Sequence, residues 1–312
     1  MVMLFPFKVK KLWLEGLVPA VFTPMTEDGE VNYSQIEPYC EYLIKCNITQ
    51  VYLNGTTGEG KSLTLSERKA VVEEWIKVSK KRLTIIVHVG CINLRESQEL
   101  ARHAQDVGAD ATASLPSLFF KPSKIDALVH HCAEIAKCAA KLPFIYYHLP
   151  VMTGVELNME DFSRQAKEQI PNFTGIKFSS KDLPDMIGVV YNGLNVLFGC
   201  DEQFVGGVAM GAHGGVGSLY NFMPKVYHKI INLIKVGNLQ TARDEQMKGQ
   251  RLCRVMYRYG AALGGNVAAL KQIMSFVGLE MGPPRSPMRE CTSEEKDQLK
   301  EELQSIGFFD WL

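Results

Sequence analysis

Short runs of β-branched and aromatic residues alternate with longer amphipathic stretches from Gly16 onwards, and this alternation constrains the fold more than any other feature. It is typical of βαβ units, in which helices connect parallel strands. Helical patterns such as 66–80, 97–107, 125–140, 159–168 and 227–236 separate the runs. The runs themselves predict eight strands, at 17–22, 50–54, 84–89, 109–115, 144–147, 175–178, 196–198 and 214–218.

Eight βα repeats predict a (β/α)8 TIM barrel over residues 14–236. A doubly wound sheet usually carries a glycine fingerprint after its first strand, whereas here that strand leads into Thr23-Pro24-Met25. Residues 237–312 are predicted to form a C-terminal helical extension packed on the barrel, because three further helical patterns follow. Without a low-complexity linker between the two parts, we expect one cooperative structure.

The charge balance argues against partners that are recruited by a strong field. Lys and Arg total 34, as do Asp and Glu, so neither nucleic acid nor an anionic membrane is an expected partner. The eight cysteines include no C-x₂-C pair, which predicts reduced thiols rather than a zinc ribbon. Apolar residues precede the basic ones within residues 1–11, the reverse of a secretory signal, so we expect a cytoplasmic protein without a membrane span.

A lysine in the sixth predicted strand is the first candidate catalytic residue. Period-two alternation places Gly175, Lys177 and Ser179 on one face and the bulky Ile176 and Phe178 on the other. The bulky pair should face the helices, so Lys177 should point into the barrel. Burial favours the neutral, nucleophilic amine that a Schiff-base lysine needs. Position alone equally allows a buried salt bridge, or an edge lysine that reaches solvent.

Tyr147 lies at the end of the fifth predicted strand, in the sequence Tyr146-Tyr147-His148-Leu149-Pro150. A phenol there could relay protons beside an imine. A strand tyrosine is also a common core residue, and His148 is interpreted as a packing or loop histidine. The remaining histidines form no recognisable metal set, so no metal site is predicted.

A glycine-rich turn after the second predicted strand, residues 54–60, could cradle a carboxylate or phosphate with Thr56 and Thr57. Together with Lys61 it also matches the P-loop pattern G-x-x-x-x-G-K-[ST]. Thr64 and Glu67 predict a capping box that starts the helix after this lysine, whereas a P-loop lysine lies in the first helical turn. Nucleotide binding therefore stays an alternative to an acid-binding turn.

The turn after the seventh predicted strand, Gly199-Cys200-Asp201-Glu202, carries two carboxylates. In isolation Asp201 could be a helix N-cap and Glu202 a first-turn residue. At a barrel mouth, beside Ser218 from the end of the eighth strand, they could instead grip a polyhydroxyl ligand.

These four features, in this order, resemble the class I pyruvate aldolase superfamily that contains N-acetylneuraminate lyase and dihydrodipicolinate synthase. The resemblance covers residues 14–284, and within the superfamily the details look like the sialic acid lyases of vertebrate type. The synthases place an arginine where this chain has Met152, which cannot hold a carboxylate. The motifs that carry the resemblance are G-T-T-G-E at 55–59, Y-x-x-P at 147–150, G-I-K-F-S at 175–179 and G-G-V-G-S at 214–218.

The resemblance implies a reaction in which Lys177 forms an imine with the C2 carbonyl of sialic acid, and pyruvate and N-acetylmannosamine are released. Tyr147, with Thr56 as partner, would move the proton of the C4 hydroxyl, and Thr56 and Thr57 would hold the carboxylate. No metal or organic cofactor is implied, because the protonated imine is the electron sink. The implied hydroxyl-binding residues are Ser179, Gly199, Asp201, Glu202 and Ser218.

The resemblance also implies a homotetramer. The chain departs from the family pattern at two places, and two alternative functions stay open. Lys61 replaces a residue that is usually neutral, and the segment 118–121 lacks a tyrosine that bacterial relatives often supply from a neighbouring subunit. Another pyruvate aldolase, acting on a different sugar acid or keto acid, would need Lys177 and Tyr147 equally. The second alternative is a sugar-acid-binding homologue without catalysis.

Overall fold

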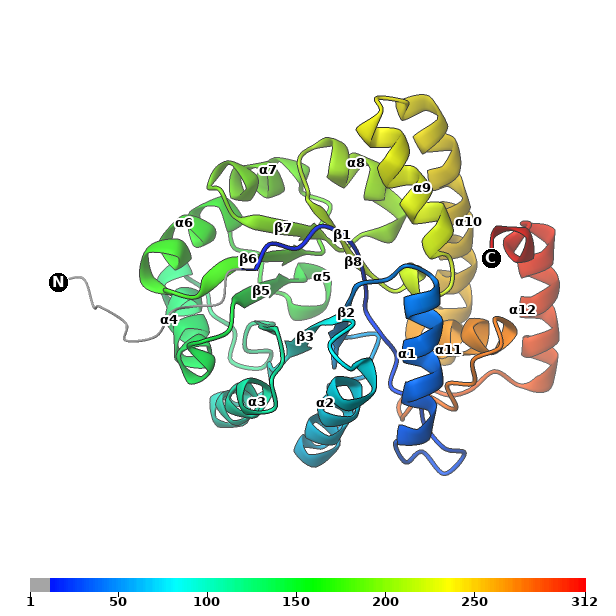
Figure 1. Ribbon diagram of the computed structural model, residues 1–312, viewed down its shortest axis with the longest axis horizontal. Coiled ribbons are helices and arrows are strands. Elements are labelled where there is room, and N and C mark those ends of the chain that lie inside the picture. Colours follow the sequence, from blue (N-terminus) through cyan, green and yellow to red (C-terminus); the bar gives the residue numbers. More distant parts are fainter. Residues whose placement is uncertain (1–11) are drawn as a thin grey trace.

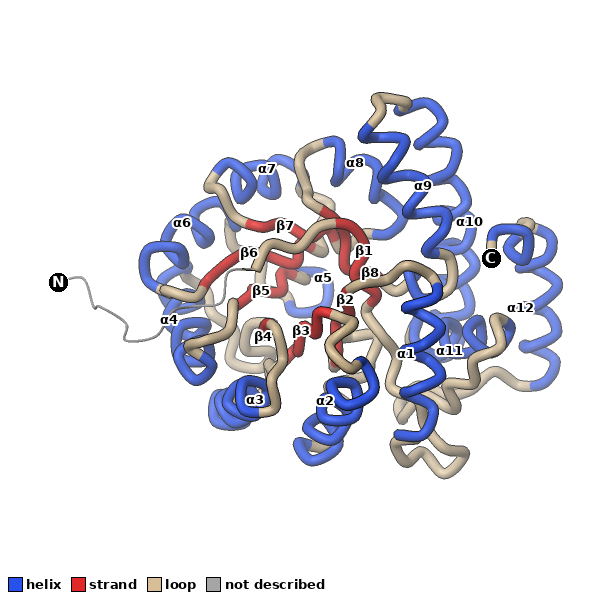
Figure 2. The backbone as a smooth tube through the Cα atoms, in the orientation of Figure 1, coloured by secondary structure: helices blue, strands red, loops and turns tan. Residues whose placement is uncertain are grey.

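The computed structural model describes residues 12–312. The segment 1–11, which was interpreted above as differing from a secretory signal, lies outside the described residues. Eight parallel strands form one sheet in the order β1-β8-β7-β6-β5-β4-β3-β2, surrounded by helices (Figure 2). A parallel bridge between Ala20 and Tyr52 brings the two edge strands together. The predicted (β/α)8 barrel with a C-terminal helical region is confirmed.

Each predicted run overlaps one observed strand, with bounds that shift by a few residues. The first strand ends earlier than predicted, and beyond Pro19 only Ala20 adds the isolated bridge. The observed strands are β1 (Gly16–Pro19), β2 (Gln50–Leu53), β3 (Thr84–His88), β4 (Ala111–Ser114), β5 (Phe144–His148), β6 (Phe173–Phe178), β7 (Asn195–Phe198) and β8 (Gly214–Gly217).

Helices follow the strands and cover the outside of the barrel. Thr64 caps α2 in a reciprocal capping box with Glu67, as predicted. The helices are α1 (Ile36–Lys45), α2 (Leu65–Ser79), α3 (Leu94–Asp106), α4 (Ile125–Ala136), α5 (Pro150–Thr153), α6 (Met159–Gln169), α7 (Leu183–Tyr191), α8 (Phe204–Ala209), α9 (Pro224–Lys235), α10 (Leu239–Leu263), α11 (Asn266–Phe276) and α12 (Ser293–Ser305).

Period-two alternation divides the buried side chains into an outer and an inner core. In β3, Ile85 and Val87 belong to the large cluster between strands and helices, whereas Ile86 belongs to a smaller cluster inside the barrel. In β6, Ile176 and Phe178 likewise belong to the outer cluster. A side chain between them, at position 177, is therefore directed into the barrel interior.

The extension lies against one side of the barrel. Figure 1 shows α10, α11 and α12 gathered beside α9. Helix α10 contacts α9, α11 and α12. Within residues 12–312, no helix has the length and apolar character needed to cross a membrane.

Candidate active site

A cavity of about 170 Å³ lies at the carboxyl ends of the strands, between the barrel and the extension. In barrels of this kind the loops at that end carry the chemistry. The cavity brings together every site residue that the sequence predicted: Thr56, Thr57, Tyr147, Lys177, Ser179, Gly199, Asp201, Glu202 and Ser218.

Lys177 occupies the interior position that alternation predicted and is only 4% exposed. Its Nζ lies 4.2 Å from the ring centroid of Tyr52 and 4.0 Å from that of Tyr147. No ion pair involves Lys177 within the described residues, so the structure does not support the buried salt-bridge alternative. The amine instead lies between two aromatic faces, at the wall of the cavity.

The Tyr147 hydroxyl lies 3.4 Å from Thr56 Oγ1, which links the fifth strand to the turn after the second. Tyr146 points to the opposite side, where its ring packs 4.7 Å from Phe162. His148 is also a packing residue, with its ring centroid 5.0 Å from that of Phe178. Burial lowers the pKa of His148 to about 4, so it is neutral at physiological pH.

The 55–60 turn is held in its shape by close packing of its glycines. A Cβ on Gly60 would lie 1.9 Å from Asn54 O, and one on Gly58 would lie 2.9 Å from Val21 O. Thr23 Oγ1 donates to Gly58 O at 2.7 Å and fixes the turn to the chain after β1. Thr57 is buried, while Thr56 is half-buried at the cavity.

Asp201 is buried at the cavity, and its Oδ2 accepts a hydrogen bond from Leu219 N at 2.9 Å. This carboxylate therefore ties the β7 loop to the β8 loop, and the residue that caps the short helix after β7 is Cys200 rather than Asp201. Burial raises the pKa of Asp201 to about 6. Next to it, a Cβ on Gly199 would lie 1.9 Å from Ser179 Oγ, so this position needs glycine.

The structure gives no support to the nucleotide alternative. The helix after the turn begins at Leu65, so Lys61 lies outside its first turn. Lys61 Nζ donates to Gly90 O at 2.6 Å, and burial lowers its pKa to about 8. Gly90 O also accepts from Arg68, so two cations share one carbonyl oxygen behind the turn.

Several residues at the cavity or in contact with Lys177 were not predicted as site residues. Tyr52, whose ring contacts Lys177, could have been found from the alternation in β2, since Val51 and Leu53 face the outer core. The wall contributed by the extension has no local sequence signal and consists of Cys253, Met256 and Tyr257 from α10 and Asn266, Val267 and Leu270 from α11. No cluster of three potential metal ligands occurs within residues 12–312.

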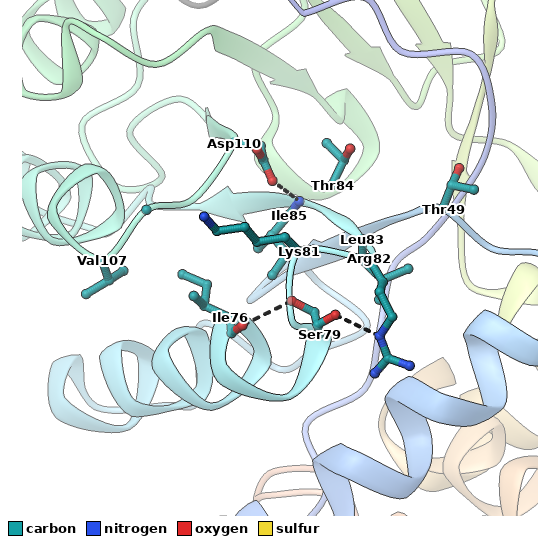
Figure 3. Close-up of a pocket in the computed structure, with 11 residues that line it drawn as sticks. Thr49, Ile76, Ser79, Lys81, Arg82, Leu83, Thr84, Ile85, Val107 and Asp110 are labelled. Carbon is teal, nitrogen blue, oxygen red and sulfur yellow. Dashed lines mark hydrogen bonds between the residues drawn. The ribbon is translucent and has the colours of Figure 1, made fainter.

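A larger cavity, of about 680 Å³, lies at the opposite end of the barrel, between the amino ends of β2, β3 and β4 (Figure 3). Two of its charged side chains are engaged in local structure: Asp110 accepts from Ile85 N at 2.8 Å, and Arg82 donates to Ser79 O at 3.0 Å. None of the predicted site residues lines it. Because reactive groups of barrels lie at the carboxyl ends, this cavity is not the candidate active site.

Comparison with known proteins decides the family. The model of the dihydrodipicolinate synthetase family matches residues 13–306. The chain belongs to this family. Among members of the dihydrodipicolinate synthetase family, N-acetylneuraminate lyases from Rattus norvegicus and Homo sapiens are each 41% identical over 309 residues, covering 97% of this chain and 95% of the relative.

Solved structures of family members agree with the fold. N-acetylneuraminate lyase from Proteus mirabilis has a TM-score of 0.90 and 36% identity, covering 95% of this chain and 100% of that chain. Sialic acid aldolase from Aliivibrio salmonicida also has a TM-score of 0.90, with 35% identity.

Proposed function

We propose that the protein is a class I aldolase that reversibly cleaves N-acetylneuraminate to N-acetylmannosamine and pyruvate. The observation that carries the proposal is the position of Lys177, buried between the Tyr52 and Tyr147 rings in a cavity that also contains hydroxyl-binding candidates. The similarity to proteins named N-acetylneuraminate lyase supports the substrate class.

In this mechanism, Lys177 Nζ attacks C2 of the open-chain sugar acid, and water leaves as the imine forms. Thr56 and Thr57 bind the carboxylate and orient the carbonyl towards the amine. Tyr147 and Thr56, which are hydrogen-bonded to each other, relay the proton of the C4 hydroxyl to the substrate carboxylate while the C3–C4 bond breaks. The electron pair of that bond moves into the protonated imine and gives an enamine, so the mechanism requires no metal or organic cofactor.

The enamine then takes a proton at C3, and water hydrolyses the resulting pyruvate imine to release pyruvate and free Lys177. The departing N-acetylmannosamine portion is bound through its hydroxyls by Ser179, Gly199, Asp201, Glu202 and Ser218. The apolar Met152 at the cavity edge fits a sugar substrate better than an acidic amino aldehyde.

Borohydride trapping tests the mechanism, because it reduces an imine to a stable amine. Pyruvate plus borohydride should label Lys177 alone, since no other lysine of the described residues lines the cavity. Lys177→Arg should abolish labelling and cleavage, because a guanidinium does not form the imine. Tyr147→Phe should retain some labelling, while cleavage falls by about 10² to 10⁴.

Peptide mapping of the reduced adduct gives the decisive result. A label on another lysine, or full activity in Lys177→Arg, would exclude the Schiff-base mechanism at this position. Labelling by pyruvate without cleavage of N-acetylneuraminate would instead favour the second candidate, an aldolase for a different sugar acid or keto acid.

We also propose that the enzyme is a cytoplasmic homotetramer. Its eight cysteines are all free, which fits a reducing compartment. An aromatic pair after β4, Phe119 and Phe120, is 76% and 84% exposed, and Val151 and Met152 after β5 are also exposed. Exposed apolar groups in these two segments support contact with another copy of the chain.

A further inference from the structure

A buried ion pair joins the helical extension to the turn that holds Thr56 and Thr57. Lys271 Nζ, from α11, lies 2.6 Å from Glu59 Oε1, and the two side chains are 2% and 0% exposed. Among ion pairs of the described residues, this is the most deeply buried. Lys271 Nζ also donates to Pro283 O at 2.9 Å, which ties α11 to the segment that follows it.

The second oxygen of Glu59 binds that same segment. Glu59 Oε2 accepts from Arg285 N at 2.8 Å. The Arg285 side chain then donates to Ser62 O at 2.9 Å and forms an ion pair with Glu67 in the first turn of α2. Residues from the extension therefore hold Glu59, near the end of the turn, and the chain that leads from the turn into α2.

The turn needs such support, because its backbone is strained at Glu59. This residue has φ of +52°, in the left-handed region that L side chains seldom adopt. A conformation of that kind is unfavourable in isolation and persists only where surrounding contacts fix it. Glu59 N donates to Thr56 O at 3.0 Å, so a displacement of Glu59 would also displace Thr56.

We propose that Lys271 and Glu59 are positioning residues for the carboxylate half of the substrate. Their ion pair holds the turn so that the donors of Thr56 and Thr57 are aligned before pyruvate or sialic acid arrives, which lowers the cost of binding. The same helix also forms part of the cavity wall through Val267 and Leu270. The inference rests on the proposed aldolase function.

The test measures the two substrates of the condensation reaction separately, in the full-length protein. In Lys271→Met, the KM for pyruvate should rise by about 10- to 100-fold, because its carboxylate site is misaligned. The KM for N-acetylmannosamine should stay within about twofold, since the Asp201 side of the cavity is untouched. Borohydride trapping should need correspondingly more pyruvate for half-maximal labelling.

Two further variants separate positioning from stability. Glu59→Gln combined with Lys271→Met removes both charges, so no uncompensated charge is left buried. The raised pyruvate KM should remain in this double variant, because the link from α11 to the turn is still missing. The matched control is Arg258→Met, which breaks an ion pair between α10 and α12 and should change neither KM.

A lower melting temperature with unchanged pyruvate KM would mean that the pair serves stability alone, and the inference would be overturned. Equal rises in both KM values, or failure of both Lys271 variants to fold, would overturn it as well. A wild-type protein that neither cleaves sialic acid nor traps pyruvate would refute the proposed function itself, an outcome distinct from these.

Discussion

Asp201 is a buried acidic residue of the cavity that lowers the stability of the folded chain. The residue is 7% exposed, and burial raises the pKa of its carboxyl from 3.8 to about 6. One pKa unit corresponds to about 1.4 kcal/mol, so keeping this group ionised at neutral pH costs the folded state about 3 kcal/mol. Such a cost is expected where a buried carboxylate serves a ligand rather than the fold.

We therefore predict that Asp201→Asn stabilises the unliganded protein at pH 8 while it weakens binding of N-acetylmannosamine. The folded-state pKa lies above the unfolded one, so stability from this group is present below pH 3.8 and is lost as pH rises through about 6. The gain in melting temperature should accordingly shrink between pH 8 and pH 4. Thermal unfolding across this range measures it, and a gain independent of pH would contradict the assignment.

Among the secondary-structure elements, α10 has a role at the site that its sequence does not reveal. Gln246 Nε2 and the Tyr227 hydroxyl each donate to Asp201 O at 2.9 Å, and Gln250 Nε2 donates to Glu202 O at 3.2 Å. The backbone of the acidic turn is thus held from behind by two helices. The barrel loop supplies the carboxylates, and α9 and α10 fix their place.

We predict that Gln246→Leu raises the KM for N-acetylmannosamine by about 3- to 30-fold, as expected for one or two lost hydrogen bonds. The pyruvate KM should stay unchanged, because the Thr56 turn makes no contact with Gln246. Steady-state condensation kinetics measure both values. A change in pyruvate KM alone would show that α10 does not act through the acidic turn.

Sequence patterns predicted the strands and the inward-facing site residues, because these features repeat locally. Alternation around Lys177 decides which way it points, and a barrel then gathers the strand ends. The contacts of Gln246 and Lys271 could not be predicted in this way, because they join residues 45 and 212 positions away in sequence. On a helix, both side chains have the appearance of ordinary solvent-exposed residues.

At the scale of the whole molecule, the mouth of the barrel is left with apolar groups uncovered. Phe119 and Phe120 pack against each other with centroids 5.0 Å apart, yet both remain exposed to solvent in the single chain. Exposed aromatic pairs of this kind are enriched at interfaces between proteins. In the proposed tetramer, a second copy of the chain would cover this part of the surface.

We predict that replacing Phe119 and Phe120 together by Ser lowers the molecular mass measured by light scattering, because contacts between copies lose their apolar centre. The fold of each chain should persist, since neither side chain is part of the core. An unchanged mass would place the interface elsewhere, and a monomeric wild-type protein would exclude the tetramer.

The contacts that Lys271 and Arg285 make with Glu59 also bear on when, during synthesis of the chain, the binding site can form. A nascent chain that has left the ribosome as far as β8 already contains Lys177, Tyr147 and both threonines. Glu59 still lacks its partners at that moment, because they are about 55 to 70 residues further along. Premature termination between these points would therefore yield a chain with every reactive group and an unformed binding site.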